Sequence, residues 1–359
     1  MIVEFSRAFD NLFGRGEAAV TVPPLDGAFR PNRALDEAAA RFPLAGVDSL
    51  AMVSSEVLAS SGRAIHRFDQ GRWHKRSEYD AEILCLAAIG KECLAIALAT
   101  GEIVIEGGCF GGRRYKPAQP LACMTAMAGT DSELYIANGS AKNGPADWQR
   151  DLLERNASGS VWRLDLESGT FTRLADGLAW PAGLAPDAEG PVFSEAWKHQ
   201  LVRIDQRGFK VLYADLPAYP GRIAPATDGY WLALFAPRSQ LVEFVLRESA
   251  YRRRMMAEVP QAFWVAPKLR SGRSFCESLQ GGGVKHLGLL KPWAPTMSAG
   301  LCVKLDRAFQ PRASLHSRAD GRTHGVTSVA EHDGQVFIAA CGDGVVVSLP
   351  VTPLGGAEA

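Results

Sequence analysis

The chain lacks an excess of charge of either sign, a long apolar run and a paired-cysteine motif. Its 359 residues carry 39 Lys+Arg against 39 Asp+Glu, so the sequence has no electrostatic footprint for nucleic acid or an anionic membrane. No apolar run approaches the roughly 20 residues that cross a bilayer. Its 7 cysteines include no CxxC pair, which argues against a zinc knuckle and a disulfide framework. We therefore expect a soluble, cytoplasmic protein that binds neither nucleic acid nor membranes.

Several catalytic and nucleotide-binding motifs are also missing. Neither GxGxxG nor GxxxxGK[ST] occurs, and no alternation of strands with long amphipathic helices is visible, so two α/β domains are a poor account. The sequence has no HExxH motif and no GxSxG elbow, which leaves zincin and serine hydrolase chemistry without support.

The chain does contain a recurring pair of short apolar runs separated by a turn. Most runs are rich in Val, Ile, Leu and aromatic residues and are too short for typical helices, as strands are. The six pairs are Leu50–Phe68, Leu94–Glu106, Leu134–Leu164, Val192–Ile204, Tyr230–Leu246 and Val336–Leu349. Their spacings bracket the ~40–50 residues of a propeller blade, with one long step before the last pair. Because a ring of four-stranded sheets buries faces that lone hairpins expose, we predict an all-β, six-bladed β-propeller.

The domain organisation follows from this repeat. We predict an N-terminal extension packed on the propeller at residues 1–45, the propeller at 46–350 and a C-terminal tail at 351–359. A short helix is expected within Pro145–Arg155 in the third blade, because Trp148 and Leu152 lie four residues apart. The segment Arg247–Pro295 is a long insertion, placed between the fifth and sixth blades and over one mouth of the ring.

Five segments occur in a recognisable order between about Gly46 and Pro350. They are Trp148–Ala185, Ala214–Ile223, Asp228–Leu234, Gly300–Asp306 and Val329–Ala340. Together they resemble the strictosidine synthase-like family, which is related more distantly to gluconolactonases and paraoxonases. The resemblance implies a six-bladed propeller with a pocket at one end of the central channel, lined by the starts of the innermost strands. Since propellers carry unrelated chemistries, the activity must be argued from the site.

The resemblance also implies where calcium-dependent relatives hold their ion. The corresponding first-blade and third-blade positions are Asp48 and Asn138. A hard cation needs several oxygen ligands at once. Ala182 cannot ligate, and Gly221 and Arg222 replace two expected ligands with a cation that would repel the ion. We therefore expect no metal and no other cofactor, with calcium disfavoured.

The remaining candidates form one predicted catalytic group at the channel mouth. Arg222 would orient and polarise a carboxylate or oxyanion, or would instead simply pair with Asp48 across the channel. Asp48 or His324 would act as the base for water, since an unperturbed histidine titrates at about pH 6.5. The predicted substrate-binding residues are Asn138, Trp148, Glu195, Tyr219 and Thr327. Glu195 could instead stabilise a turn, and the two aromatic residues could pack between blades. Thr327 stands where strictosidine synthase has its acid/base glutamate, which disfavours alkaloid-forming condensation.

The leading hypothesis is a metal-independent hydrolase that opens a small, anionic, lactone-like or related ring. One alternative is a lyase or condensing enzyme that acts on C–C or C–N bonds in the same pocket. Another is a non-catalytic propeller that binds a small molecule. A small-molecule substrate is the partner we predict, and the oligomeric state is left open.

Overall fold

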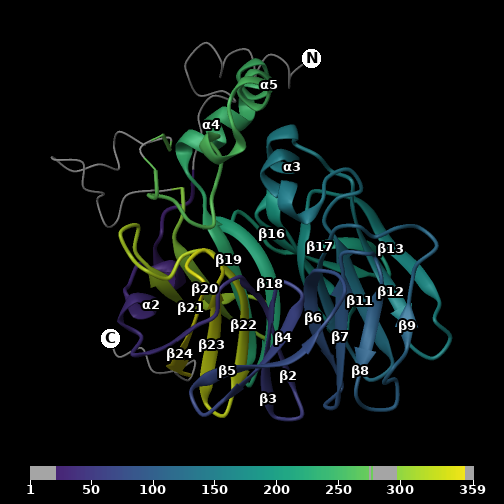
Figure 1. Ribbon diagram of the computed structural model, residues 1–359. Coiled ribbons are helices and arrows are strands. Elements are labelled where there is room, and N and C mark those ends of the chain that lie inside the picture. The colour runs from purple at the N-terminus through teal and green to yellow at the C-terminus, as the bar shows by residue number, and fades with distance from the viewer. Residues whose placement is uncertain (1–21, 275, 278–296, 352–359) are drawn as a thin grey trace.

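Six four-stranded antiparallel sheets form a ring in the computed structural model, which describes residues 22–274, 276–277 and 297–351 (Figure 1). Blade 1 contains β2 (Val47–Val53), β3 (Glu56–Ser61), β4 (Ala64–Asp69) and β5 (Arg72–Glu78). Blade 2 contains β6 (Ile83–Ile89), β7 (Cys93–Leu98), β8 (Ile103–Glu106) and β9 (Arg114–Tyr115). Blade 3 contains β10 (Met124–Gly129), β11 (Glu133–Asn138), β12 (Gly159–Asp165) and β13 (Phe171–Leu178).

The second half of the ring repeats this order. Blade 4 contains β14 (Pro181–Ala185), β15 (Val192–Glu195), β16 (Gln200–Asp205) and β17 (Gly208–Tyr213). Blade 5 contains β18 (Ala218–Ala226), β19 (Gly229–Pro237), β20 (Gly300–Asp306) and β21 (Pro311–Ser317). Blade 6 contains β22 (Val326–His332), β23 (Gln335–Ala340), β24 (Val345–Pro350) and β1 (Ala40–Pro43). The predicted all-β six-bladed propeller is therefore confirmed.

The outermost strand of blade 6 comes from the other end of the described chain. Strand β1 pairs antiparallel with β24, with Ala40 opposite Ser348 and Pro43 opposite Val345. This pairing closes the ring, so the predicted boundary at residue 46 begins the propeller too late. The rest of the predicted extension includes α2 (Ala34–Glu37) and a 3₁₀ turn at Gly27–Phe29. Residues 1–21 of the extension and 352–359 of the tail lie outside the described residues.

Both predicted insertions leave blades at the same kind of connection, between the second and third strands. In blade 3 this connection holds α3 (Trp148–Glu154), which confirms the predicted helix. In blade 5 it holds α4 (Gln240–Arg247), α5 (Ser249–Glu258) and a 3₁₀ turn at Gln261–Phe263. The long insertion therefore lies inside blade 5, not between blades 5 and 6. Its residues 275 and 278–296 lie outside the described part.

The second run of the fifth predicted pair is a helix rather than a strand. Leu241, Val242, Val245 and Leu246 form the apolar face of α4, with Val242 and Val245 buried, whereas Phe244 is 46% exposed. Residues three and four apart share one face of a helix, so this run packs a single apolar stripe. Its true partner strand, β20, lies about 60 residues further along the chain than β19 and pairs Leu234 with Leu301.

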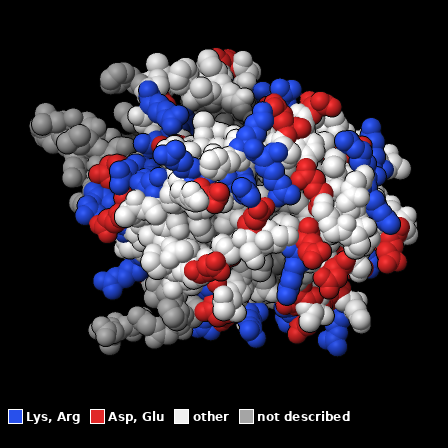
Figure 2. All heavy atoms as spheres, turned by 60° about the horizontal axis from the view of Figure 1, so that its bottom comes forward, with Lys and Arg blue, Asp and Glu red and all other residues white. Residues whose placement is uncertain are grey.

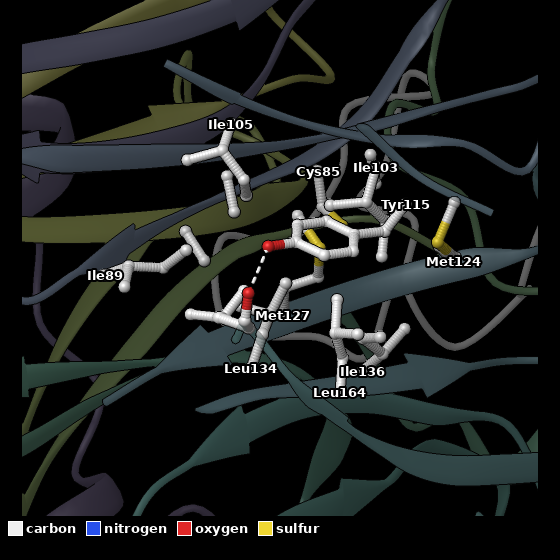
Figure 3. Packing of buried hydrophobic residues seen from close by; sticks show 14 of the residues in the cluster. Cys85, Ile89, Ile103, Ile105, Tyr115, Met124, Met127, Leu134, Ile136 and Leu164 are labelled. Atoms are coloured by element: carbon white, nitrogen blue, oxygen red, sulfur yellow. Dashed lines mark hydrogen bonds between the residues drawn. The ribbon is translucent and has the colours of Figure 1, made fainter. Parts of the chain in front are cut away.

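Apolar side chains between neighbouring blades make up the core. Figure 3 shows the contact of blade 2 with blade 3, where Ile89, Ile103 and Ile105 face Leu134 and Leu164. Each fully buried side chain of this kind stabilises the fold by about 1.5–3 kcal/mol. The hydroxyl of Tyr115 lies within this cluster and donates to the carbonyl of Leu166 at 2.5 Å, so burial leaves it with a partner.

Buried serines join the innermost strands of neighbouring blades. Ser328 of β22 accepts the amide of Leu50 in β2 at 2.9 Å. Ser49 of β2 accepts the amide of Leu86 in β6 at 3.1 Å. These hydroxyls satisfy backbone groups on the channel edge of strands that have no further strand beside them. The inner strands are therefore held at a fixed spacing around the channel.

Candidate active site at the upper channel mouth

The six inner strands all begin at the end of the ring that carries the helices. In blade 3, Met124 at the start of β10 pairs with Asn138 at the end of β11, just before the connection with α3. In blade 5, Ala218 at the start of β18 pairs with Pro237, just before α4. We call this end the upper face; it is at the top of Figure 1. The first residues of the inner strands therefore form the upper channel mouth.

Arg222 of β18 reaches into this mouth and uses all five of its N–H groups. Its Nε donates to the carbonyl of Thr125 at 3.1 Å. Its Nη1 donates to the carbonyls of Asp48 and Thr327 at 3.0 and 3.3 Å. Its Nη2 donates to the carbonyl of Leu84 at 2.9 Å and to Oδ2 of Asp48 at 2.6 Å. One guanidinium from blade 5 therefore bonds to the inner strands of blades 1, 2, 3 and 6.

The charge of Arg222 is balanced at the same place. Burial by itself would lower the pKa of the guanidinium, but the Asp48 carboxylate outweighs burial and raises that pKa. The sequence left open whether Arg222 would meet substrate or pair with Asp48, and the structure shows the pair. With no free N–H group, Arg222 positions Asp48 and does not offer donors to an oxyanion.

Asp48 keeps one oxygen open to solvent. Its Oδ2 accepts from Arg222, while Oδ1 has no hydrogen-bond partner among the described residues, and its side chain is 34% exposed. The backbone carbonyl of Asp48 also accepts from the Thr327 hydroxyl at 2.7 Å. The predicted substrate-binding Thr327 thus supports the backbone of the predicted base. The carboxylate is oriented by Arg222 and reachable by water.

An aromatic wall rises from blades 3, 4 and 5 above this pair. Its members are Trp148, Trp180, Trp197, Tyr219 and Phe235. Trp197 stacks on Trp180 at 5.2 Å between ring centroids and faces Trp148 at 6.3 Å. A Cβ built on Gly221 would lie 3.5 Å from the Phe235 ring, so the wall borders the residue before Arg222. Trp148 and Trp197 are partly exposed.

Two features fix the wall in place. The Nε1 of Trp197 donates to Oδ1 of the fully buried Asp151 on α3 at 2.9 Å. Trp180 has φ +58, a left-handed conformation that is strained for a bulky residue. Such strain persists only where surrounding contacts determine it. Here Trp180 stacks on Trp197, and its carbonyl accepts from the amide of Ala196 at 2.9 Å. Nothing in the local sequence marks Asp151 as a functional residue, because its partner Trp197 lies in another blade.

His324 is not available as a base in this structure. It is fully buried, its Nε2 donates to the carbonyl of Arg318 at 2.7 Å, and its Nδ1 accepts from the Ser298 hydroxyl at 2.9 Å. Burial, with the nearby Arg270, lowers its pKa below the ordinary value. Both ring nitrogens are therefore occupied in the neutral form. The predicted catalytic role of His324 is therefore not supported. The sequence pattern could not show this, because the partners of His324 come from segments that it does not place beside the histidine.

Three further predicted substrate-binding residues serve local structure. Asn138 is buried, accepts from the amide of Cys123 at 3.0 Å and donates to the carbonyl of Ser140 at 3.0 Å. Glu195 is 2% exposed and accepts from the amide of Ala179 and from the side chains of Lys198 and Gln200. Tyr219 is fully buried within the wall, and burial beside Glu243 raises its pKa well above the ordinary value. Of the predicted group, Asp48, Arg222 and Thr327 meet at the mouth, and Trp148 stands in the wall above it.

The described residues contain no group of three His, Cys, Asp or Glu side chains arranged to hold a metal ion. The axial position that Asp48, Thr125 and Thr327 surround with oxygens is taken by the Arg222 guanidinium. The thiol of Cys341 is also near this pair, but burial raises its pKa to about 12, which makes it a poor nucleophile. Asp48 thus offers a carboxylate oxygen at this mouth that has no partner among the described residues.

Among comparisons with known proteins, the structure of regucalcin supports the fold. No family model and no curated protein matches the chain. A structure of regucalcin from Agrobacterium tumefaciens, described as a calcium-binding protein, aligns with TM-score 0.50 and 13% identity over 87% of this chain and 93% of that chain. A luciferin-regenerating enzyme aligns with TM-score 0.45 and 11% identity over 87% of this chain and 88% of that chain. The resemblance to strictosidine synthase-like proteins stays a prediction.

Proposed function

We propose that the protein is a metal-independent hydrolase that opens a small lactone-like or related cyclic substrate at the upper channel mouth. The observation that carries the proposal is the Asp48 carboxylate, with one oxygen held by Arg222 and the other unpartnered among the described residues and open to solvent. A carboxylate in that state can take a proton from a water molecule that attacks an ester carbonyl. The same proton then returns to the ring oxygen as the ring C–O bond breaks.

The geometry changes the expected substrate in one respect. The sequence favours an anionic molecule, because an Arg222 without other partners would bind it. All five N–H groups of Arg222 are used inside the protein and its charge faces Asp48, so an anion would meet the Asp48 carboxylate instead. The aromatic wall offers flat apolar surfaces on which a ring can stack. The proposed substrate is therefore an uncharged ring with apolar substituents.

The test is turnover of a panel of neutral lactones and esters in the presence of EDTA. Asp48→Asn keeps the shape of the side chain but removes the base, and we expect a loss of about 10²–10⁴-fold in kcat. Asp333→Asn is a matched control, because Asp333 lies in an exposed hairpin turn, is 85% exposed and has a φ of +47 that asparagine tolerates. Equal turnover by wild type and Asp48→Asn would remove Asp48 from the mechanism.

The second candidate is a binding propeller without catalysis. It is favoured by the hydrogen bonds that occupy Arg222, His324 and Asn138, which leave one candidate base and no free oxyanion donor from this group. Calorimetric binding of a neutral lactone without turnover would select this candidate. Where turnover is seen, incorporation of oxygen from labelled water would separate hydrolysis from a lyase or condensing reaction.

A further inference from the structure

Below Arg222 the channel continues as a cavity of about 460 Å³. All six inner strands line it, from Leu50 in β2 round to Glu331 in β22. The lining extends to residues at the turns between the first and second strands, including Gly90 and Asp131, both of which are exposed. The cavity therefore opens at the lower face, opposite the mouth with Asp48, and its volume is within the range of small-molecule pockets.

Arg222 separates this cavity from the site above. It lines the cavity, yet each of its N–H groups is bonded to an oxygen at the upper mouth. Asp48, Leu84 and Thr327 belong to that upper group and do not line the cavity. A ligand that enters from below would meet a guanidinium that has no donor left to give. The two ends of the channel are thus chemically different sites.

Alanines contribute to the wall of the cavity beside larger apolar side chains such as Leu50, Met52 and Met127. Ala51, Ala88, Ala126, Ala128 and Ala224 contribute from four different blades. Because alanine reaches only one carbon from the backbone, these positions leave the axis open where larger residues would fill it. The lining covers two to four residues along each inner strand, at most roughly 13 Å at the rise of a β-strand. These dimensions suit a slender chain better than a broad ring.

Apart from Arg222, the charged residues that line the cavity are the acidic Asp131 and Glu331, and one of these carboxylates is free to bind. Glu331 is saturated, because its two oxygens accept from Thr227, Trp231 and Lys304. Lys304 is buried between Glu331 and Asp228, so it offers no positive charge to a ligand. Asp131 is exposed and has no hydrogen-bond or ion-pair partner within the described residues. Figure 2 shows this side of the molecule, on which acidic and basic side chains are mixed around uncharged surface.

We propose that the lower cavity binds a medium-chain primary aliphatic amine. The alkyl chain lies along the alanine-lined axis, where it leaves water, and the ammonium group remains at the mouth and pairs with Asp131. A fatty carboxylate is disfavoured, since Arg222 is the one basic residue among the described lining and its donors are occupied. This site does not depend on the proposed hydrolase activity, because Asp48 takes no part in it.

Calorimetric titration of the full chain with octylamine, octanol and octanoate tests the proposal. We expect octylamine to bind about two- to fivefold more tightly than the other two, because an ion pair with an exposed carboxylate adds a modest gain in affinity. Asp131→Asn should reduce the affinity for octylamine to that for octanol. Ala128→Phe should weaken octylamine and octanol alike, because the ring would occupy the axis. Lactone turnover should be unchanged in both variants.

Three results would overturn the proposal. They are no binding of octylamine, binding of octanoate as tight as octylamine, or an Asp131→Asn variant that retains the preference for the amine. Ala88→Leu replaces Ala128→Phe if circular dichroism shows that the latter does not fold, since Ala88 lines the same cavity from β6. Unchanged octylamine binding in a folded filled-channel variant would place the amine elsewhere and would also refute the site.

Discussion

At the scale of single residues, the centre of the molecule depends on a side chain with several donors in a fixed plane. Arg222 satisfies four backbone carbonyls and a carboxylate from five planar N–H groups. Lysine has three donors on one atom and cannot span acceptors on several strands. Each unpaired buried acceptor would cost about 1–3 kcal/mol. The guanidinium is thus both a counter-charge for Asp48 and a link between blades.

A second buried cation, Lys304, should also stabilise the folded protein. Lys304 is 1% exposed, bonds to Asp228 at 2.6 Å and Glu331 at 3.1 Å, and lies 5.0 Å from the Trp231 ring centroid. Lys304→Met keeps the length but leaves the buried Glu331 carboxylate without its counter-charge. We expect a loss of about 3 kcal/mol in the free energy of unfolding, measured by urea denaturation. Lys210→Met on the exposed strand β17 is the control and should change it by less than about 0.5 kcal/mol.

The same cluster predicts a pH dependence. Burial by itself would raise the pKa of Glu331, but hydrogen bonds from Thr227, Trp231 and Lys304 outweigh burial and lower it to about 2. Because the folded pKa lies below the unfolded value of about 4.3, the stabilisation is complete above about pH 5 and is lost as pH falls towards 2. Urea midpoints at pH 6 and pH 3 should differ less in Glu331→Gln than in wild type. An equal difference in both proteins would contradict the assignment.

Asp151 gives a prediction about the aromatic wall. Asp151→Asn leaves the volume of the side chain unchanged but weakens the acceptor for the Trp197 indole. Since Asp151 lies on α3 and does not face the mouth, we expect a higher KM for neutral lactones with little change in kcat. A shift in tryptophan fluorescence should accompany it. Unchanged KM and fluorescence would show that Trp197 keeps its position without this bond.

The residues that could be predicted from the sequence are those whose environment is set by strand order. Asp48 and Arg222 stand near the starts of inner strands, and ring closure brings such positions together. His324 and Glu195 could not be assigned, because their neighbours depend on side-chain contacts with Ser298, Arg318 and Ala179. No local pattern reports those contacts. The sequence therefore shows which side chains could do the chemistry. The hydrogen bonds in the structure show which of those side chains are free to do it.

At the scale of elements, hairpins with local turns could be predicted and long-range pairings could not. The turn at Asp333-Gly334 has φ +47 and +68 and directly joins paired strands, which is the short left-handed turn that such a dipeptide favours. Strand β1 pairs with β24, which lies about 300 residues away in the chain. No turn motif in the sequence indicates this pairing or its register. The segment of α4 contains valines, which favour strands, so the sequence alone suggests a strand there. It is a helix because Val242 and Val245 then lie on one face that is buried.

The strand that closes the ring, β1, gives a further prediction. Phe42 of β1 lies 4.6 Å from the Phe68 ring in blade 1, so it joins the closing strand to the first blade. Phe42→Ala should lower the free energy of unfolding by about 2 kcal/mol, somewhat less than a fully buried phenylalanine. Phe209→Ala is the control, because Phe209 lies on the outer strand β17 and is 58% exposed. Equal urea midpoints for the two variants would show that Phe42 does not help to close the ring.

At the scale of the whole molecule, the ring creates an axis with an oxygen-rich upper end and an apolar lower end. No helix in the described part of the chain combines the length and apolar character of a membrane span. Helices α3, α4 and α5 stand on the upper face only (Figure 1). A Cβ on Gly342 would lie 2.2 Å from the carbonyl oxygen of Leu269, so glycine lets the insertion lie close to blade 6. The cytoplasmic location stays a prediction.

The Arg222 guanidinium acts as the cation at the upper end of the channel. The most direct measurement is thermal unfolding of wild type, Arg222→Lys and Arg222→Ala, each with EDTA and with calcium. We predict that the wild-type Tm is the same in both conditions and that both variants unfold at lower temperature, Arg222→Ala recovering with added methylguanidinium. A wild-type Tm that falls in EDTA and returns with calcium would contradict the account.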